Sequence, residues 1–428
     1  MSPIESRLAR HQVSFTIQKK KNQILRVFAV FFHPNSIVTA MGGAEKRFVK
    51  TLEFFVKKKE LEITVLEPKP SLLSQVDIAC KMHSLSSSLQ AKGWVGTYVG
   101  WMFWIANATI KSLSIARQSK PSLILIPNNT LPNLISGYAV SLILHLPSCV
   151  ITHHIDAPLS TRNTRNASLY DCYRSIKYSP MISLVKTVAS YLTLSLLKRA
   201  DGIITVSNST ARILKHGGIS EKRICVSGNG IDSDVVERVK QNPKKKTYDG
   251  IFVGRIAKEK GVFDLLRVWK QVVKVRKNAK LLLVGSGLEL THLRESIAKA
   301  NLTNNVFVRG SCNDIELYGL LSASKVFIFP SIFEGWGIAV AEALACGLPV
   351  VAYDIPALAE VFGDCQSVFL VPAMNTENMT STILDILDSG DNEMIALSNY
   401  ARNYAEQFSW EKVARKDLEL LRTFENHA

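Results

Sequence analysis

Short apolar runs alternate with amphipathic helical stretches over most of the chain, and this alternation comes in two series. Strands separated by helices form parallel sheets, because parallel neighbours need a long crossover connection. The expected strands of the first series are 25–31, 62–66, 123–126, 149–152 and 202–205. Those of the second series are 250–254, 280–285, 306–309, 326–330 and 349–353. The sequence therefore predicts an α/β protein with two Rossmann-like sheets.

The length of the chain predicts two domains. Its 428 residues exceed one ordinary hydrophobic core, and an apolar fraction of 47% is enough for two cores. We expect a first domain at 1–236, a linker at 237–250 and a second domain at 251–404. The polar-faced helix at about 405–428 is expected to pack back on the first domain.

The net charge of +16 lies entirely in the first half of the chain. Residues 1–199 hold 25 Lys and Arg against 9 Asp and Glu, whereas residues 200–428 hold 27 of each kind. Such a surface is either simply solvated or faces an anionic partner, which would be a membrane leaflet or a nucleic acid. The sequence shows no helix-turn-helix, zinc-finger or basic-aromatic motif, so we expect no nucleic acid as a partner. A peripheral contact with an anionic membrane remains the alternative to a solvated surface.

A tryptophan-rich stretch bears on this alternative, with Trp94, Trp101 and Trp104 within eleven residues. The apolar stretch ends before Lys111, which is short of the ~20 residues needed to span a bilayer. It is either a core helix or an interfacial element with its indole rings at the depth of the lipid headgroups.

Two features of the sequence point to a cytoplasmic location. Residues 1–23 are polar and basic and do not resemble a secretory signal. The seven cysteines form no CxxC pair, as is typical of a reducing compartment.

The strongest candidate site follows the expected strand 326–330. Glu334 would lie in the loop after this strand, and Glu342 about two turns into the next helix, which opens near Gly337. Gly335 and Gly337 leave room for a ligand at the backbone N–H groups, where a helix N-terminus favours an anion. The spacing alone is also consistent with Glu334 and Glu342 being two ordinary solvent-exposed glutamates that form no site.

Two further loops that follow expected strands have residues suited to phosphate. Arg255 and Lys260 combine a guanidinium fork with an ammonium group, which suits a diphosphate, although many basic loops are only solvated. Gly42 and Gly43 lie at a strand-to-helix turn and permit the close approach of a ligand. The full GxGxxG fingerprint is absent, which argues against a nicotinamide dehydrogenase.

A histidine pair ends the expected strand 149–152. His153 and His154 precede Asp156, and the three residues could form a metal site, a structural contact or a substrate contact. Neighbouring side chains on an extended backbone point to opposite sides, so both imidazoles cannot easily reach one ion. A substrate-contacting histidine is the favoured interpretation.

These segments, taken in this order, resemble the retaining glycosyltransferases of the GT-B fold that carry the E-x7-E signature, glycosyltransferase group 1 or family 4. The resemblance is densest over 251–354 and looser over the first domain. It implies an acceptor-binding first domain and a second domain that binds a nucleotide sugar, facing each other across a cleft.

The resemblance also implies roles for the donor-site residues. Arg255 and Lys260 would bind the donor diphosphate, together with the backbone of the Gly42-Gly43 turn. Glu342 would accept hydrogen bonds from the ribose hydroxyls.

Further roles concern the transferred sugar. Glu334, with the amides of Gly335 to Gly337, would contact this sugar. Trp336 stands where the family often has Phe or Ser, and it would shape the sugar pocket. His154 would contact the sugar or the acceptor near the anomeric carbon, while His153 points away.

The activity implied by the resemblance is hexose transfer from a UDP- or GDP-sugar to a lipid-linked or glycan acceptor, with retention and with neither metal nor other cofactor. Fixed cations and helix amides would stabilise the leaving diphosphate by electrostatic preorganisation. Retention by two displacements would need a carboxylate beneath the anomeric carbon. Because Glu334 is assigned to sugar hydroxyls, same-face substitution is the favoured mechanism. A nucleotide-sugar epimerase and a non-catalytic sugar-nucleotide binding protein are the alternatives.

Overall fold

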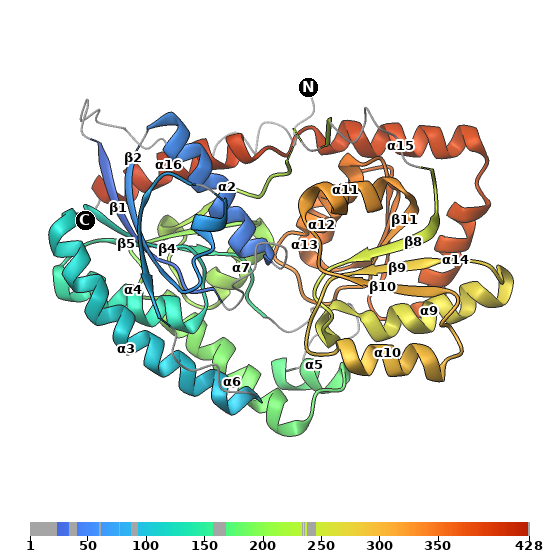
Figure 1. Ribbon diagram of the computed structural model, residues 1–428, viewed down its shortest axis with the longest axis horizontal. Coiled ribbons are helices and arrows are strands. Elements are labelled where there is room, and N and C mark those ends of the chain that lie inside the picture. The colour runs from blue at the N-terminus through green and yellow to red at the C-terminus, as the bar shows by residue number, and fades with distance from the viewer. Residues whose placement is uncertain are drawn as a thin grey trace.

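The computed structural model describes residues 24–33, 41–59, 61–76, 78–86, 93–156, 168–232, 234, 236–237 and 245–426, with 93–99 placed by their backbone only. It contains two parallel sheets of seven and six strands, each flanked by helices (Figure 1). The predicted α/β architecture with two Rossmann-like sheets is confirmed. Both expected series of strands are present, and most of their apolar side chains are buried by the helices on the two faces of each sheet, with Phe307 as an exposed exception.

The first sheet has the strand order β3-β2-β1-β4-β5-β6-β7. Its strands are β1 (Leu25–Val30), β2 (Leu61–Pro68), β3 (Lys81–Leu85), β4 (Leu123–Ile126), β5 (Ser148–Thr152), β6 (Gly202–Thr205) and β7 (Ile224–Val226). Its helices are α2 (Gly43–Lys58), α3 (Gly93–Ser119), α4 (Leu131–Leu144), α5 (Leu169–Ser175), α6 (Pro180–Leu197) and α7 (Asn208–His216), with short 3-10 turns η2 (Leu73–Val76) and η3 (Glu221–Arg223). The strand order reverses beside β1, which places a switch point between β1 and β4.

The second sheet repeats this plan in the order β10-β9-β8-β11-β12-β13. Its strands are β8 (Tyr248–Val253), β9 (Leu281–Val284), β10 (Val306–Gly310), β11 (Ser324–Phe329), β12 (Val350–Asp354) and β13 (Val368–Pro372). The remaining helical elements are η4 (Lys258–Lys260), α9 (Val262–Val275), α10 (Leu290–Lys299), α11 (Asp314–Ser322), α12 (Ile338–Ala345), α13 (Pro356–Phe362), α14 (Thr376–Asp388), α15 (Asp391–Ala405) and α16 (Trp410–Asn426). Here the switch point lies between β8 and β11.

The last helix belongs to the first domain in space. Side chains of α16, among them Leu418 and Leu421, share one core with α2 and with β1. Arg47 of α2 donates to Asp417 of α16 at 2.8 Å, and both side chains are buried. The opposite face of the first sheet is covered by α3 and α4, whose buried side chains form a separate core.

The chain crosses between the domains twice, and the two crossings touch. Ile231 lies in the segment that leaves the first domain, and it forms a backbone bridge with Ser409, in the segment that returns to that domain. A Cβ on Gly230 would lie 2.3 Å from the Trp410 nitrogen, so only glycine permits this approach. Of the expected linker, residues 238–244 lie outside the described residues, as do residues 1–23. The strand β8 begins at Tyr248, inside the expected linker.

A second contact between the domains joins α7 to α13. The carboxylate of Glu360 accepts hydrogen bonds from the backbone N–H groups of Asn208, at 2.6 Å, and Ser209, at 2.5 Å. These groups form the N-terminus of α7, where a helix favours an anion. The second domain therefore supplies a carboxylate to a helix of the first.

Candidate active site

The two domains meet at the carboxyl ends of their strands. The N-terminus of α2, just after the Gly42-Gly43 turn, faces the N-terminus of α12, and a Cβ on Gly43 would lie 3.2 Å from Cδ1 of Ile338. This meeting of two helix N-termini gives the interface a field that favours negative charge. It also follows the rule that open α/β sheets bind ligands at the carboxyl ends of their strands.

Glu342 is held by a lysine from the opposite domain. Its side chain lies in the second turn of α12, 4% exposed, and its Oε1 lies 2.6 Å from Nζ of Lys46 in α2. The same ammonium lies 3.0 Å from Oδ1 of Asp314. Burial raises the pKa of Glu342, and Lys46 only partly offsets this effect. Burial lowers the pKa of Lys46, but its two carboxylate partners outweigh burial and raise it above the usual value.

Glu334 is paired with Lys260, which the sequence places on a different loop. Nζ of Lys260 contacts Oε1 of Glu334. The pair forms because the turn η4 lies against the end of β11, where a Cβ on Gly261 (φ +69°) would lie 2.0 Å from the Pro330 oxygen. The amide of Ile332 donates to the Glu259 oxygen at 3.0 Å and fixes the same approach.

Arg255 lies on the same loop but turns outward. Its guanidinium is exposed and lies 3.4 Å from the Glu259 carboxylate. Burial opposes ionisation of Glu259, but Lys186, Arg255 and the Tyr178 hydroxyl outweigh burial and lower its pKa. The structure therefore brings Lys260 directly to Glu334, whereas Arg255 contacts Glu259.

Gly335 and Gly337, which precede α12, are required to be glycine for different structural reasons. Gly337 caps the helix with φ at 104°, a conformation that L-residues rarely adopt. Gly335 lies against the first domain, because a Cβ there would lie 1.6 Å from the His153 carbonyl oxygen. The loop that carries Glu334 is thus pressed against the end of β5.

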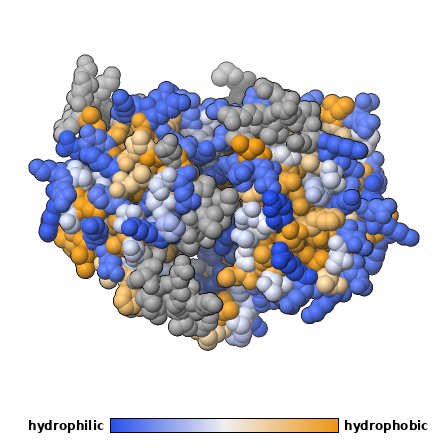
Figure 2. Space-filling model, in the orientation of Figure 1, coloured by the Kyte–Doolittle hydropathy of each residue, from blue (hydrophilic) through white to orange (hydrophobic). Residues whose placement is uncertain are grey.

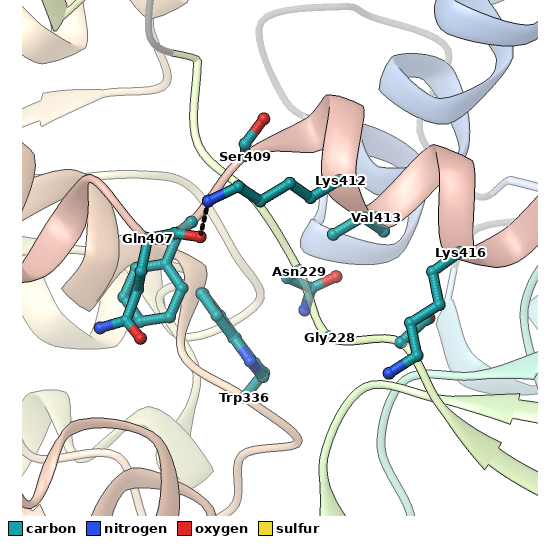
Figure 3. Close-up of a pocket in the computed structure, with 10 residues that line it drawn as sticks. Gly228, Asn229, Trp336, Gln407, Ser409, Lys412, Val413 and Lys416 are labelled. Carbon is teal, nitrogen blue, oxygen red and sulfur yellow. Dashed lines mark hydrogen bonds between the residues drawn. The ribbon is translucent and has the colours of Figure 1, made fainter.

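The ring of Trp336 packs near the chain crossings. It makes edge contacts with Phe362 and Phe408 and is largely buried. The residue lines a cavity of about 290 Å³ together with Asn229 and two lysines of α16, Lys412 and Lys416 (Figure 3). Its predicted contact with the transferred sugar stays a prediction.

The two histidines after β5 point apart, as expected from the extended backbone. Nε2 of His153 lies 3.0 Å from the Pro127 oxygen, and burial together with Arg47 lowers the pKa of His153 to about 3. His154 is partly exposed and contacts the Asp156 carboxylate, and its ring centroid lies 6.2 Å from that of Phe333 in the Glu334 loop. Within the described residues, no cluster of three or more His, Cys, Asp or Glu has the arrangement of a metal site.

Asp156 is shared by two donors. Besides His154, the hydroxyl of Tyr173 donates to its other carboxylate oxygen. Burial opposes ionisation, but His154 and the Tyr173 hydrogen bond outweigh burial and hold the pKa of Asp156 below its usual range. The carboxylate therefore stays ionised and fixes one side of the His154 ring.

Sequence reasoning missed several residues of this interface. Lys46 follows the Gly42-Gly43-Ala44-Glu45 turn, so its position directly after a predicted ligand loop was an available signal. Asp314 and Tyr173 gave no such signal, because their partners are distant in sequence or belong to no motif.

Comparison with known proteins places this geometry in a family. The model of "Glycosyl transferases group 1" matches residues 235–406, and the model of "Glycosyltransferase Family 4" matches residues 41–235. An uncharacterized glycosyltransferase of Methanocaldococcus jannaschii is 29% identical over 59% of this chain and 61% of the relative. A Campylobacter jejuni enzyme named N-acetylgalactosamine-N,N'-diacetylbacillosaminyl-diphospho-undecaprenol 4-alpha-N-acetylgalactosaminyltransferase is 28% identical over 55% of this chain and 63% of its own length. The chain thus spans less than two thirds of either relative.

A solved structure extends the comparison over the whole fold. HepE of Anabaena, in complex with UDP and glucose, superposes with a TM-score of 0.67 at 18% identity, covering 93% of this chain and 99% of that one. At this identity the likeness concerns the fold. The two adjoining family models together cover most of the chain, and they meet between the two sheets. The chain therefore belongs to the glycosyltransferases of group 1 and family 4, with the GT-B fold.

Proposed function

We propose that this protein transfers a hexose from a UDP- or GDP-sugar to a lipid-linked or glycan acceptor, with retention and without a metal ion. The observation that carries the proposal is the pairing of Lys260 with Glu334 and of Lys46 with Glu342, both where the carboxyl ends of the two sheets face each other. Lys260 and the exposed Arg255 on one loop, together with two helix N-termini at the same interface, suit a nucleotide diphosphate.

In the proposed reaction the bond between the anomeric carbon and the diphosphate oxygen breaks, and the acceptor oxygen bonds to that carbon from the same face. The departing phosphate oxygen takes the acceptor proton. Lys260 and Arg255, with the amides at the N-terminus of α12, stabilise the charge that develops on the leaving group. Glu334 and Glu342 are each engaged by a lysine and Asp156 by His154, which disfavours their use as a free nucleophile.

The donor class is supported by the UDP-bound fold relative, and the lipid-linked acceptor by the name of the Campylobacter enzyme and by the basic first domain. All seven cysteines are free, which supports a reducing compartment and hence the cytoplasmic face of a membrane.

Nucleotide release tests the proposal. Purified protein is offered a panel of UDP- and GDP-hexoses, with a polyprenyl-diphosphate glycan or a soluble glycan as acceptor, in the presence and absence of a chelator. We expect release that requires an acceptor, that resists the chelator, and that yields a product with the anomeric configuration of the donor by NMR. Lys260→Ala should lower turnover by roughly 100-fold or more, whereas Lys270→Ala, at an exposed position of α9, should not.

Each other outcome would contradict a named part of the proposal. Interconversion of the donor without acceptor indicates an epimerase, and donor binding with no release for any acceptor indicates a binding protein. A glycosyl-enzyme trapped on Glu334 would establish two displacements in place of same-face substitution.

A further inference from the structure

The helix α6 exposes an unusually apolar surface. Pro180–Leu197 is long and apolar enough to cross a membrane by length and composition, and only 11% of it is buried. Its large exposed side chains are Met181, Ile182, Leu184, Val188, Tyr191 and Leu192. Water contact with so many apolar groups is unfavourable, which marks the helix as a surface for a partner.

Contacts with the rest of the domain hold α6 in place. It packs against α4 and α5, and its Ser183 and Leu197 side chains are buried. Nζ of Lys186 lies 5.2 Å from the ring centroid of Tyr173 and 5.0 Å from that of Tyr178. One side of α6 is therefore fixed to the protein, so the helix is suited to lie along a surface and not to cross it.

Two neighbouring helices extend the apolar surface. The helix α4 packs against both α3 and α6, and the three form a layer on one side of the first sheet (Figure 1). Further exposed apolar side chains of this layer are Met102, Phe103 and Ile110 of α3, and Ile135, Leu142 and Ile143 of α4. Figure 2 shows apolar side chains at the surface over α3 and α4, at the lower left. We call this layer the α3–α4–α6 face.

Of the tryptophan-rich stretch, Trp101 and Trp104 contribute little to this face. Trp104 is 2% exposed and packs against Phe32, with ring centroids 4.8 Å apart. Trp101 is half-buried, and the side chain of Trp94 lies outside the described residues. The exposed neighbours Met102 and Phe103 carry the surface instead.

Positive charge predominates in the segment that carries these apolar side chains. Residues 93–200 contain ten Lys and Arg against two acidic residues, Asp156 and Asp171. Lys111 and Arg117 of α3 are exposed, as are Lys198 and Arg199 at the end of α6. Apolar side chains bordered by lysine and arginine match an anionic bilayer, where the former enter the acyl boundary and the latter meet the headgroups.

We propose that the α3–α4–α6 face docks on an anionic phospholipid bilayer, with α6 lying in the plane of the interface. The inference rests on the proposed function. It names the surface through which the enzyme would approach a lipid-linked acceptor. The charge excess and the apolar side chains act together, so binding has both an electrostatic and an apolar component.

Flotation with vesicles tests the surface directly. The full chain is mixed with vesicles of phosphatidylcholine alone or with phosphatidylglycerol added. The test variant is Leu184→Gln/Val188→Gln, at positions 56% and 58% exposed. The control is Val275→Gln/Ile395→Gln on the second domain, at positions 66% and 59% exposed. We expect binding only to the anionic vesicles, weaker with added salt, and reduced about tenfold or more by the test variant alone.

Outcomes separate this proposal from the enzymatic one. Absent vesicle binding, or equal binding by the test and control variants, overturns the membrane surface. A wild-type dimer in sedimentation that the test variant makes monomeric would assign the face to a second copy and also overturn it. Nucleotide release is measured in parallel with the polyprenyl-diphosphate and the soluble acceptors. Failure with every acceptor rejects the transferase, whereas release with a soluble acceptor that is retained by the test variant, which no longer floats, supports the surface.

Discussion

The adjacent histidines after β5 have opposite environments, although they differ by one position. His153 is turned into the protein toward the Pro127 carbonyl, and His154 faces the Glu334 loop and is held by Asp156. An extended backbone sends neighbouring side chains to opposite sides. One imidazole is therefore a packing group, and the other is available to a ligand.

Asp156→Asn should uncouple His154 from its fixed orientation. The amide keeps the size of the side chain but cannot hold the imidazole as an ionised acceptor does, and misplacement near reacting atoms costs about 100-fold. We expect kcat to fall toward that limit with little change in donor KM. Tyr173→Phe, which removes the other donor to Asp156, should have a smaller effect. An unchanged kcat in Asp156→Asn would contradict the role of His154.

His153 should make stability depend on pH. Its folded pKa is about 3, below the ordinary 6.5, so on acidification the unfolded chain takes up the proton first. The unfolding free energy should therefore fall as pH drops from 6.5 toward 3, by up to about 1.4 kcal/mol per pH unit. His153→Gln retains a donor for the Pro127 carbonyl and removes the titration. Urea unfolding of both proteins should give curves that diverge in this window, and parallel curves would refute the assignment.

Among the elements, the helix pair α5 and α6 crosses the domain interface through the turn that joins them. The Tyr178 hydroxyl donates to Glu259 in η4, and burial together with Glu259 raises the pKa of Tyr178, so the hydroxyl keeps its proton. Nζ of Lys258 lies 5.3 Å from the Tyr178 ring centroid and 2.9 Å from the Lys177 oxygen. A helix pair of the first domain thus fixes the loop that carries Lys260.

Tyr178→Leu should weaken donor binding through this loop. It removes both the hydrogen bond to a carboxylate and the cation–π contact, so we expect donor KM to rise about tenfold while kcat changes less. Tyr178→Phe keeps the ring and should give an intermediate KM. Steady-state kinetics with donor varied measures both, and equal KM values in the three proteins would show that η4 is held by other contacts.

The molecule as a whole depends on close approach of its domains at Gly335. The Glu334 loop presses on the His153 carbonyl there, while Glu360 and Lys46 join the domains on either side. The requirement for glycine at position 335 thus comes from contact with the first domain, and not from its own dihedral angles.

Gly335→Ala should prevent this closure without unfolding either domain. Its Cβ would overlap the His153 oxygen, so the loops of the two domains would be displaced, and we expect turnover to fall about 100-fold. Gly390→Ala is the matched control, because a Cβ there meets nothing within 4 Å. Far-ultraviolet circular dichroism should be unchanged in both variants, and wild-type turnover in Gly335→Ala would show that the closed interface is dispensable.

Local pattern predicted much of this architecture, and the misses have physical reasons. Strands β4 and β6 were predicted to the residue because they are wholly buried apolar runs. The edge strands β3, β7 and β13 were missed. Lys81–Leu85 is largely exposed and mixes polar with apolar residues, Ile224–Val226 has only three residues, and Val368–Pro372 ends in proline. The Lys46–Glu342 pair joins positions 296 apart, and such a distance is set by the docking of two domains, which no single segment encodes.

The paired crossings at Ile231 and Ser409 are the natural hinge between the domains. We expect any opening of the domains to turn about these two touching segments, so that displacement grows in proportion to the distance from them. Trp336, whose cavity lies beside the crossings, would travel least, whereas the α5 region at the opposite edge of the molecule in Figure 1 would sweep the widest arc. Tyr178 and Glu259 should then be the first contact to separate, and their rupture would release Lys260 before Glu342 leaves Lys46.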